Sequence, residues 1–116
     1  MAPLGNTLSK AERLSGEKAV SELIAGGSWG SCGCLKYCWA ERGTEGSRLM
    51  VSVPKRLFKR AVRRNLLKRR IREAYRIQKP AGIDILIQFN SPEPESFERI
   101  RSDVSTLLSR IDAARK

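Results

Sequence analysis

The sequence predicts an α+β fold in which a small sheet packs against helices in two layers. Residues 83–89 are the most strand-like run in the chain, and residues 97–111 carry apolar side chains at helical spacing. A long segment rich in lysine and arginine precedes that strand. With 116 residues and 41% hydrophobic content, the chain has material for one modest core and not for two. We therefore expect a single domain over residues 1–116, with flexible ends at 1–7 and 112–116.

The first half of the chain predicts a helix followed by two strands. Residues 8–25 have an imperfect amphipathic helical pattern, and the glycine- and serine-rich residues 26–33 are typical of a loop. Aromatic and alternating residues at 34–40 indicate a strand, and residues 42–47 supply turn chemistry. Residues 48–53 form the second strand, which we expect to pair antiparallel with the first.

Hydrophobic spacing predicts which faces of these elements are buried. In residues 48–53 apolar and polar side chains alternate, so the odd-numbered face, Leu49, Val51 and Val53, should point inward. Pro54 ends this strand. The apolar residues of the last helix are spaced so that they fall along one side of it: Phe97, Ile100, Val104, Leu107, Leu108 and Ile111. We expect that helix to pack on the core.

The positive charge of the protein is concentrated in one segment. The chain has 23 basic and 12 acidic residues, a formal charge of +11. Residues 55–79 hold 12 basic residues and one acid, Glu73, so this segment alone carries 12 − 1 = +11 and the remainder is balanced. We expect the segment to be helical until Pro80 and Gly82 end it. Such a surplus indicates a polyanionic partner, either nucleic acid or an anionic membrane.

The predicted basic helix has a packing side and a charged side. Leu67, Ile71, Ala74 and Tyr75 gather on one side of a helical wheel, and Asn65, Lys68, Arg69, Arg72 and Arg76 gather on the other. A basic helix is often only a solvated face, but eleven excess charges in one segment favour an anion-binding role. Because arginine predominates, and its planar fork can hold two phosphate oxygens or stack on a base, we favour RNA over a membrane surface.

Several kinds of chemistry are disfavoured. The chain has no histidine, which removes serine–histidine and cysteine–histidine nucleophiles and the commonest metal ligand. Cys32, Cys34 and Cys38 lack a fourth zinc ligand, and their odd number favours free thiols in a reducing compartment. No apolar run approaches the roughly 18 residues needed to span a bilayer, and no signal peptide is evident, so we expect a cytoplasmic protein without a membrane partner.

The basic segment resembles the signature helix of the bacterial ribonuclease P protein component. The motif is carried by Lys55-Arg56, by Ala61-Val62-Arg63-Arg64-Asn65 and by the run from Lys68 to Arg76. The pieces around it, in order, are similar too: residues 8–14, 23–27, 51–53 and 84–89. The resemblance covers roughly residues 8–111. It departs from the family at Leu66, where an arginine usually follows the asparagine.

The resemblance implies a fold and a function. The fold is αβββαβα, with a left-handed β-α-β crossover through the basic helix, as in the second domain of ribosomal protein S5. The function is that of the protein subunit of a ribonucleoprotein, one RNA and one protein, which removes the 5′ leader from precursor tRNA. The catalytic RNA performs the hydrolysis with Mg²⁺ that RNA and substrate bind, and the protein alone is inactive. DNA is not an expected partner.

The resemblance also implies two binding surfaces. The residues expected to contact RNA are Lys55, Arg56, Arg63, Arg64, Asn65, Lys68, Arg69, Arg72 and Arg76. The single-stranded leader would lie in a cleft between the first helix and the sheet, where Val20 and Ile24 occupy positions that are often phenylalanine. Tyr37 is the candidate stacking platform there, with Trp29 and Trp39 as further candidates; core filling is the alternative for Tyr37 and Trp39.

Two other functions compete with this one. A ribosomal or other structural RNA-binding protein can carry a similar basic helix. A metal-dependent nuclease that acts without RNA would cleave substrate by itself. Promotion of leader cleavage by the catalytic RNA separates the first hypothesis from both.

Overall fold

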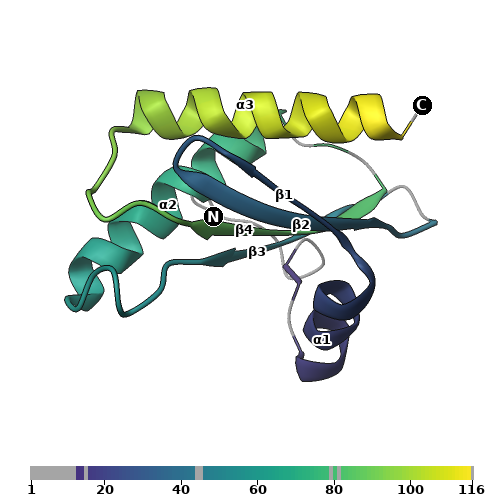
Figure 1. Cartoon of the computed structure of the whole chain (residues 1–116), viewed down its shortest axis with the longest axis horizontal. Coiled ribbons are helices and arrows are strands. Elements are labelled where there is room, and N and C mark those ends of the chain that lie inside the picture. The colour runs from purple at the N-terminus through teal and green to yellow at the C-terminus, as the bar shows by residue number, and fades with distance from the viewer. Residues whose placement is uncertain (1–12, 15, 44–45, 79, 81, 116) are drawn as a thin grey trace, which may run out of the picture.

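One four-stranded sheet organises the part of the chain that the computed structural model describes, which is residues 13–14, 16–43, 46–78, 80 and 82–115. The element order is the predicted αβββαβα (Figure 1). The elements are α1 (Glu17–Gly26), β1 (Ser28–Cys32), β2 (Leu35–Glu41), β3 (Arg48–Ser52), α2 (Ala61–Gln78), β4 (Ile83–Phe89) and α3 (Phe97–Ala114). The described helices include none that is long and apolar enough to cross a membrane.

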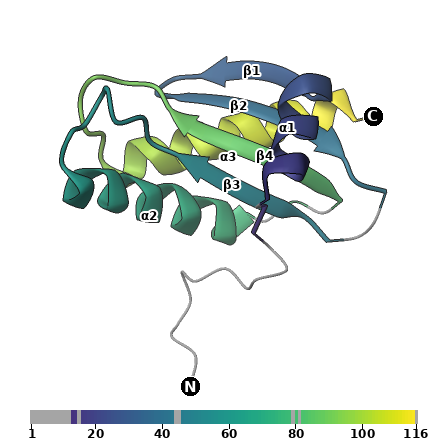
Figure 2. The same cartoon turned by 90° about the horizontal axis from the view of Figure 1, so that it is seen from below.

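The helices cover the two faces of the sheet unequally. Both α2 and α3 pack on one face, where α2 lies along β3 and α3 crosses β1 and β2 (Figure 2). The short α1 rests on part of the opposite face (Figure 1). Alternation along β4 supplies both cores: Ile85 and Ile87 face α2 and α3, and Leu86 faces α1. Among the described elements, no other helix covers the α1 face.

The position of β3 corrects the predicted strand pairing. The sheet order is β1-β2-β4-β3, so β3 is an edge strand that pairs in parallel with β4, and β4 pairs antiparallel with β2. The antiparallel pairing of residues 48–53 with the preceding strand was wrong. The physical reason is that β4 is buried on both faces and needs a neighbour on each side, and α2 returns the chain so that β4 enters between β2 and β3.

The predicted loop at residues 26–33 contains β1, which pairs antiparallel with β2. Its glycine is required by packing and does not mark a turn. A Cβ on Gly30 would lie 2.6 Å from the ring of Tyr37, its partner on β2. The turn of this hairpin is formed by Gly33, whose φ of 56° favours glycine.

The predicted first helix begins later than its sequence pattern suggests. Of residues 8–25, residues 8–12 and 15 lie outside the described part, and α1 begins at Glu17. Arg13 forms a parallel bridge with Leu49 of β3, and the Leu14 amide donates to the Leu49 carbonyl at 2.9 Å. Leu14 is thus buried against α1 from an extended segment and not from a helix.

The basic segment also enters its helix later than expected. Residues 55–57 form a turn, in which the amide of Leu57 donates to the carbonyl of Pro54, and α2 begins at Ala61. Phe58 is buried and its ring lies 5.8 Å from that of Phe89. This aromatic anchor explains why the apolar residues before Ala61 do not share the phase of the helix.

The remaining predicted elements are confirmed. The strand at residues 34–40 corresponds to β2, residues 83–89 are β4, and the apolar stripe of the last helix is α3. The odd-numbered face of β3 is buried, as is the predicted packing side of the basic helix: Leu67, Ile71, Ala74 and Tyr75. Residues 112–114, expected to be flexible, continue α3, and the Arg115 guanidinium pairs with the Glu41 carboxylate at 2.6 Å.

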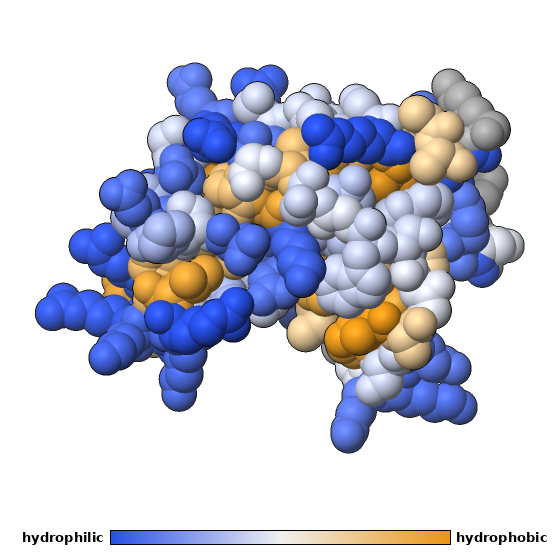
Figure 3. Space-filling view, viewed as in Figure 1, coloured by the Kyte–Doolittle hydropathy of each residue, from blue (hydrophilic) through white to orange (hydrophobic). Residues whose placement is uncertain are grey.

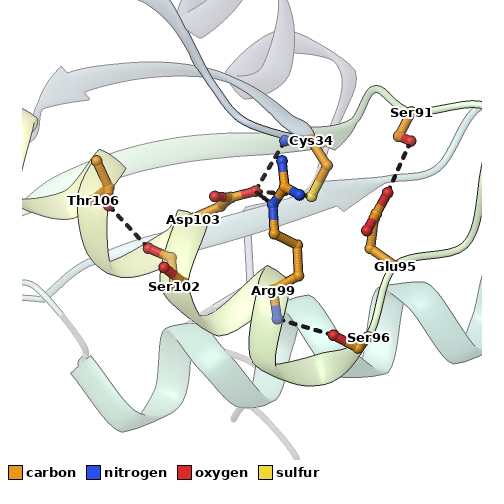
Figure 4. A network of polar contacts seen from close by, with 8 residues as sticks. All are labelled: Cys34, Ser91, Glu95, Ser96, Arg99, Ser102, Asp103 and Thr106. Carbon is orange, nitrogen blue, oxygen red and sulfur yellow. Dashed lines mark hydrogen bonds and ion pairs between the residues drawn. The ribbon is translucent and has the colours of Figure 1, made fainter.

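A buried carboxylate joins α3 to the β1–β2 hairpin (Figure 4). Oδ2 of Asp103 accepts hydrogen bonds from the Cys34 amide at 2.9 Å and from the Cys34 thiol at 3.1 Å, and it pairs with Nε of Arg99 at 3.1 Å. Burial opposes the charge of this carboxylate, but these three donors outweigh it and lower the pKa of Asp103. Burial and the Asp103 contact raise the pKa of the Cys34 thiol to about 12, so this thiol remains protonated.

We expect Asp103→Asn to destabilise the fold by about 1–3 kcal/mol at pH 7, because the amide presents only one neutral acceptor to donors that a carboxylate satisfies. The folded pKa of Asp103 is below its unfolded value, so its contribution is complete above about pH 4 and is lost as the pH falls. In urea unfolding measured from pH 7 to pH 3, the difference in free energy of unfolding between wild type and Asp103→Asn should become smaller. A difference in free energy of unfolding that does not change with pH would contradict this. So would an equal loss of stability in the exposed control Glu93→Gln.

Candidate nucleic-acid interface

The flanks of α2 point in different directions because its packing stripe is fixed against the core. The predicted RNA-contact residues do not reach solvent equally. Those that are exposed are Lys55, Arg56, Arg63, Asn65 and Arg69, and those that are half-buried are Arg64, Lys68, Arg72 and Arg76. Lys55 and Arg56 belong to the turn before the helix. The structure thus brings the nine side chains to one helix and its entry, and spreads them over more than one face.

Some arginines of α2 are engaged within the protein. Nη1 of Arg64 donates to the carbonyls of Phe58 and Lys59, at 2.9 and 2.7 Å, and so closes the turn that precedes the helix. Nη1 of Arg70 donates to the Glu95 carbonyl at 2.6 Å, towards α3. Nη2 of Arg76 pairs with Glu73 at 2.7 Å. These three side chains therefore have structural contacts that a contact with RNA would have to share.

Other polar side chains of this segment have no partner within the described part of the chain. Among the nine predicted contact residues they are Lys55, Arg56, Arg63, Asn65, Lys68, Arg69 and Arg72. Burial and the charge of Arg13 lower the pKa of Arg72. Arrays of cations without carboxylates raise the free energy of the folded protein, and a bound polyanion relieves that repulsion. This unpaired set is the strongest feature of the interface.

Apolar side chains lie among these cations. Val62 is 78% exposed and Leu66 is 38% exposed, both on α2. Figure 3 shows an apolar patch surrounded by hydrophilic side chains at the end of the molecule where α2 begins. Leu66 stands at the position where the resemblance expects arginine. This flank of α2 therefore exposes an apolar side chain there in place of a cation.

The open part of the α1 face forms a second candidate surface. Val20 is half-buried on α1 and Ile24 is 45% exposed. Trp29, on the edge strand β1, is 46% exposed, and its indole N–H donates to the Ile24 carbonyl at 3.3 Å. Nζ of Lys36 lies 5.1 Å from the ring centroid of Trp29. Exposed aromatic, aliphatic and cationic groups are thus adjacent, which is a combination that can stack a base and hold its phosphate.

The structure places Tyr37 away from this surface. Tyr37 is buried in the core between the sheet and α3, on the face opposite α1, so it does not line a cleft with Val20 and Ile24. Successive residues of a strand alternate between faces, and Cys38, the neighbour of Tyr37, is the one that packs under α1. Trp39 shares the face of Tyr37 and is partly buried there. Only the pairing of β1 with β2 reveals that Trp29 is the aromatic residue on the α1 side.

The cysteines and acidic residues do not assemble a metal site in the part of the chain that is described. Cys32, Cys34 and Cys38 are free and buried, and they are divided between the two cores. Groups of three or more potential metal ligands are absent among the described residues. Asp84, in front of β4, is held by Arg48 at 2.8 Å and by Arg42 at 3.3 Å.

Comparison with known proteins gives a consistent result. The family model described as ribonuclease P matches residues 8–112. The ribonuclease P protein component of Chlorobaculum tepidum is 39% identical, over 91% of this chain and 83% of that protein. That of Porphyromonas gingivalis is 37% identical over 68% of this chain, and the match spans 60% of that relative's length.

Solved structures agree in fold. The ribonuclease P protein of Thermotoga maritima superposes with a TM-score of 0.76, at 28% identity, over 85% of this chain and 96% of that chain. The Staphylococcus aureus protein superposes with a TM-score of 0.78, at 24% identity, over 88% of this chain and 96% of that chain. At that identity the second likeness bears on the fold alone.

Proposed function

The chain belongs to the ribonuclease P protein family, and on that premise we propose that it is the protein subunit of ribonuclease P. It binds the catalytic RNA and the 5′ leader of precursor tRNA, and so raises the affinity for substrate during removal of that leader. One protein and one RNA form the particle. The observation that carries this proposal is a set of cations on α2 that have no partner among the described residues, Arg63, Lys68, Arg69 and Arg72. A buried apolar stripe on the same helix fixes their directions.

The two surfaces suit two different tasks. Exposed Arg69 and half-buried Lys68 on α2 present charge to a folded RNA backbone, where a guanidinium can hold two phosphate oxygens. The α1 face presents Val20, Ile24 and Trp29 to an unpaired strand, whose bases stack without regard to sequence. Because α1 and α2 lie on opposite faces of the sheet, one small protein can contact both RNAs at once.

In this proposal the protein has no catalytic residue. Hydrolysis uses Mg²⁺ held by the catalytic RNA and the substrate, and the protein acts by positioning and by neutralising phosphate charge. No step is assigned to Asp84 or Asp103, since both carboxylates are occupied by arginines.

Replacing Arg69 with alanine should weaken RNA binding without loss of stability, because this exposed side chain has no partner in the described chain. One charged contact corresponds to about a tenfold loss in affinity. Binding to a bacterial ribonuclease P RNA should be measured between 50 and 200 mM salt. The slope of log K against log salt should become shallower by about 0.7 to 0.9 for each phosphate contact removed.

Two variants serve as comparisons for Arg69→Ala. Arg101→Ala removes an exposed arginine from α3 and should leave the affinity unchanged. Arg64→Ala should instead lower the melting temperature, because it frees the carbonyls of Phe58 and Lys59. Equal affinity losses for Arg69→Ala and Arg101→Ala would reduce the interface to a diffuse charge effect and would count against the assignment.

Replacing Trp29 with alanine should weaken binding of precursor tRNA that carries a leader and leave mature tRNA binding unchanged. Loss of one base stack is worth about 1–3 kcal/mol. Trp29→Phe should keep most of the affinity because it retains an aromatic face. If Trp29→Ala weakens the binding of precursor tRNA and mature tRNA equally, the residue supports the fold and does not hold the leader.

A further inference from the structure

The start of α2 exposes a pair of apolar side chains. Val62 is 78% exposed and Leu66 is 38% exposed. They are four residues apart on the helix, so their side chains lie next to each other on one flank. Single exposed apolar residues are common on protein surfaces, but two adjacent ones on a densely charged helix form a continuous apolar surface. The core does not depend on this pair, because neither residue belongs to the buried stripe of α2.

The pair lies before the place where α2 meets the segment that leads into α3. Nη1 of Arg70 donates to the Glu95 carbonyl at 2.6 Å, one turn further along the helix than Leu66. Arg70 follows Leu66 at the spacing that brings helical side chains together, so one of the cations beside the pair is engaged within the protein. Arg70 is therefore poorly placed to supply the cation that is missing at position 66.

Two exposed arginines flank the pair. Arg63 and Arg69 stand three residues before and three residues after Leu66, so they lie on either side of it along the helix. Their Cα atoms are separated by about 9 Å along the helix axis. Neither side chain makes an ion pair or a hydrogen bond with another described residue. The surface therefore combines an apolar centre with an unpaired guanidinium group on each side.

A nucleotide has the chemistry that fits this surface. An unpaired base presents a planar face for packing, and the phosphates on both sides of it are anionic. Leucine and similar apolar side chains pack against unstacked bases in other nucleic-acid complexes. A protein partner fits less well, because stable protein interfaces bury about 1,200 Å² or more and are depleted in charged residues at their centre. Two exposed side chains on a helix dense in cations do not supply such an interface.

We propose that Val62 and Leu66 form an apolar platform for one unpaired base of the catalytic RNA, and that Arg63 and Arg69 hold the phosphates next to that base. This inference rests on the proposed function and adds to it a contact that depends on no charge. The catalytic RNA is the source because the leader is assigned to the α1 face, on the other side of the sheet from α2. At Leu66 this chain thus exchanges a charged contact for a base contact.

Replacing Leu66 with alanine tests the platform. Leu66→Ala should bind a bacterial ribonuclease P RNA about five- to tenfold more weakly, because the base loses most of its apolar contact. The slope of log K against log salt should stay as in wild type, since no phosphate contact is removed, whereas Arg69→Ala should make this slope shallower. Leu66→Met keeps the apolar volume and should bind as wild type. A shallower slope for Leu66→Ala would contradict an uncharged contact.

Ile77→Ala is the matched control for Leu66→Ala. Ile77 is 49% exposed on the same helix and follows Leu66 by eleven residues, which places it on nearly the same side. Its neighbour Arg76 is paired with Glu73, so the surroundings of Ile77 differ from those of Leu66 in having a matched cation. Ile77→Ala should bind the RNA as wild type. Equal affinity losses for Ile77→Ala and Leu66→Ala would overturn the platform.

The choice of RNA separates failure of the platform from failure of the proposed function. The same variants should also be tested with precursor tRNA alone. Wild-type affinity of Leu66→Ala for the catalytic RNA, with the loss in Arg69→Ala intact, would overturn the platform alone and leave the apolar pair to a protein partner. A loss confined to precursor tRNA would overturn the assignment to the catalytic RNA. If wild type bound neither RNA, the proposed function would fail and the platform with it.

Discussion

The packing of α2 against the sheet is the interaction on which the rest of the molecule depends. Leu67, Ile71, Ala74 and Tyr75 are each no more than 1% exposed. The Tyr75 hydroxyl is satisfied by the Ser47 hydroxyl at 2.8 Å, just before β3. Full burial of one large apolar side chain is worth about 1.5–3 kcal/mol. This stripe fixes the rotation of the helix, and with it the directions of all its charged residues.

The protein has two regions that differ in how their arginines are paired. Around β4 and α3, several arginines are paired with carboxylates: Arg42 and Arg48 with Asp84, and Arg99 with Asp103. The two pairs at Asp84 hold neighbouring segments of the sheet together. Along α2, cations outnumber acids, and Arg72 is half-buried with no carboxylate partner among the described residues. An RNA-binding protein has reason to tolerate this, since the free energy stored in repulsion is recovered when phosphates bind.

Local patterns in the sequence predicted a large part of this structure, and long-range pairing accounts for most of what they missed. Helical spacing identified the packing stripe of α2 and the buried face of α3, because periodicity depends only on the element itself. The parallel pairing of β3 depends on where the chain returns after α2, which no local pattern encodes. The strand β1 was missed because the residues around it are rich in glycine and serine, as in a loop. One of these glycines, Gly30, is required by the nearby Tyr37 ring.

The candidate site was predictable to a similar degree. Charge concentration led directly to α2, but which of its arginines are occupied depends on backbone carbonyls of Phe58 and Glu95 that the helical wheel does not include. The assignment of Tyr37 to the leader cleft failed on strand parity, which the pairing of β1 with β2 decides.

Leader cleavage at limiting Mg²⁺ tests the central claim most directly. A bacterial ribonuclease P RNA and precursor tRNA should be incubated with and without the protein, and the release of the 5′ leader should be followed. We predict that the protein alone releases none, and that its addition to the RNA raises the cleavage rate or lowers the precursor concentration needed. Leader cleavage by the RNA that is unchanged when the protein is bound would contradict the account and favour a purely structural RNA-binding role.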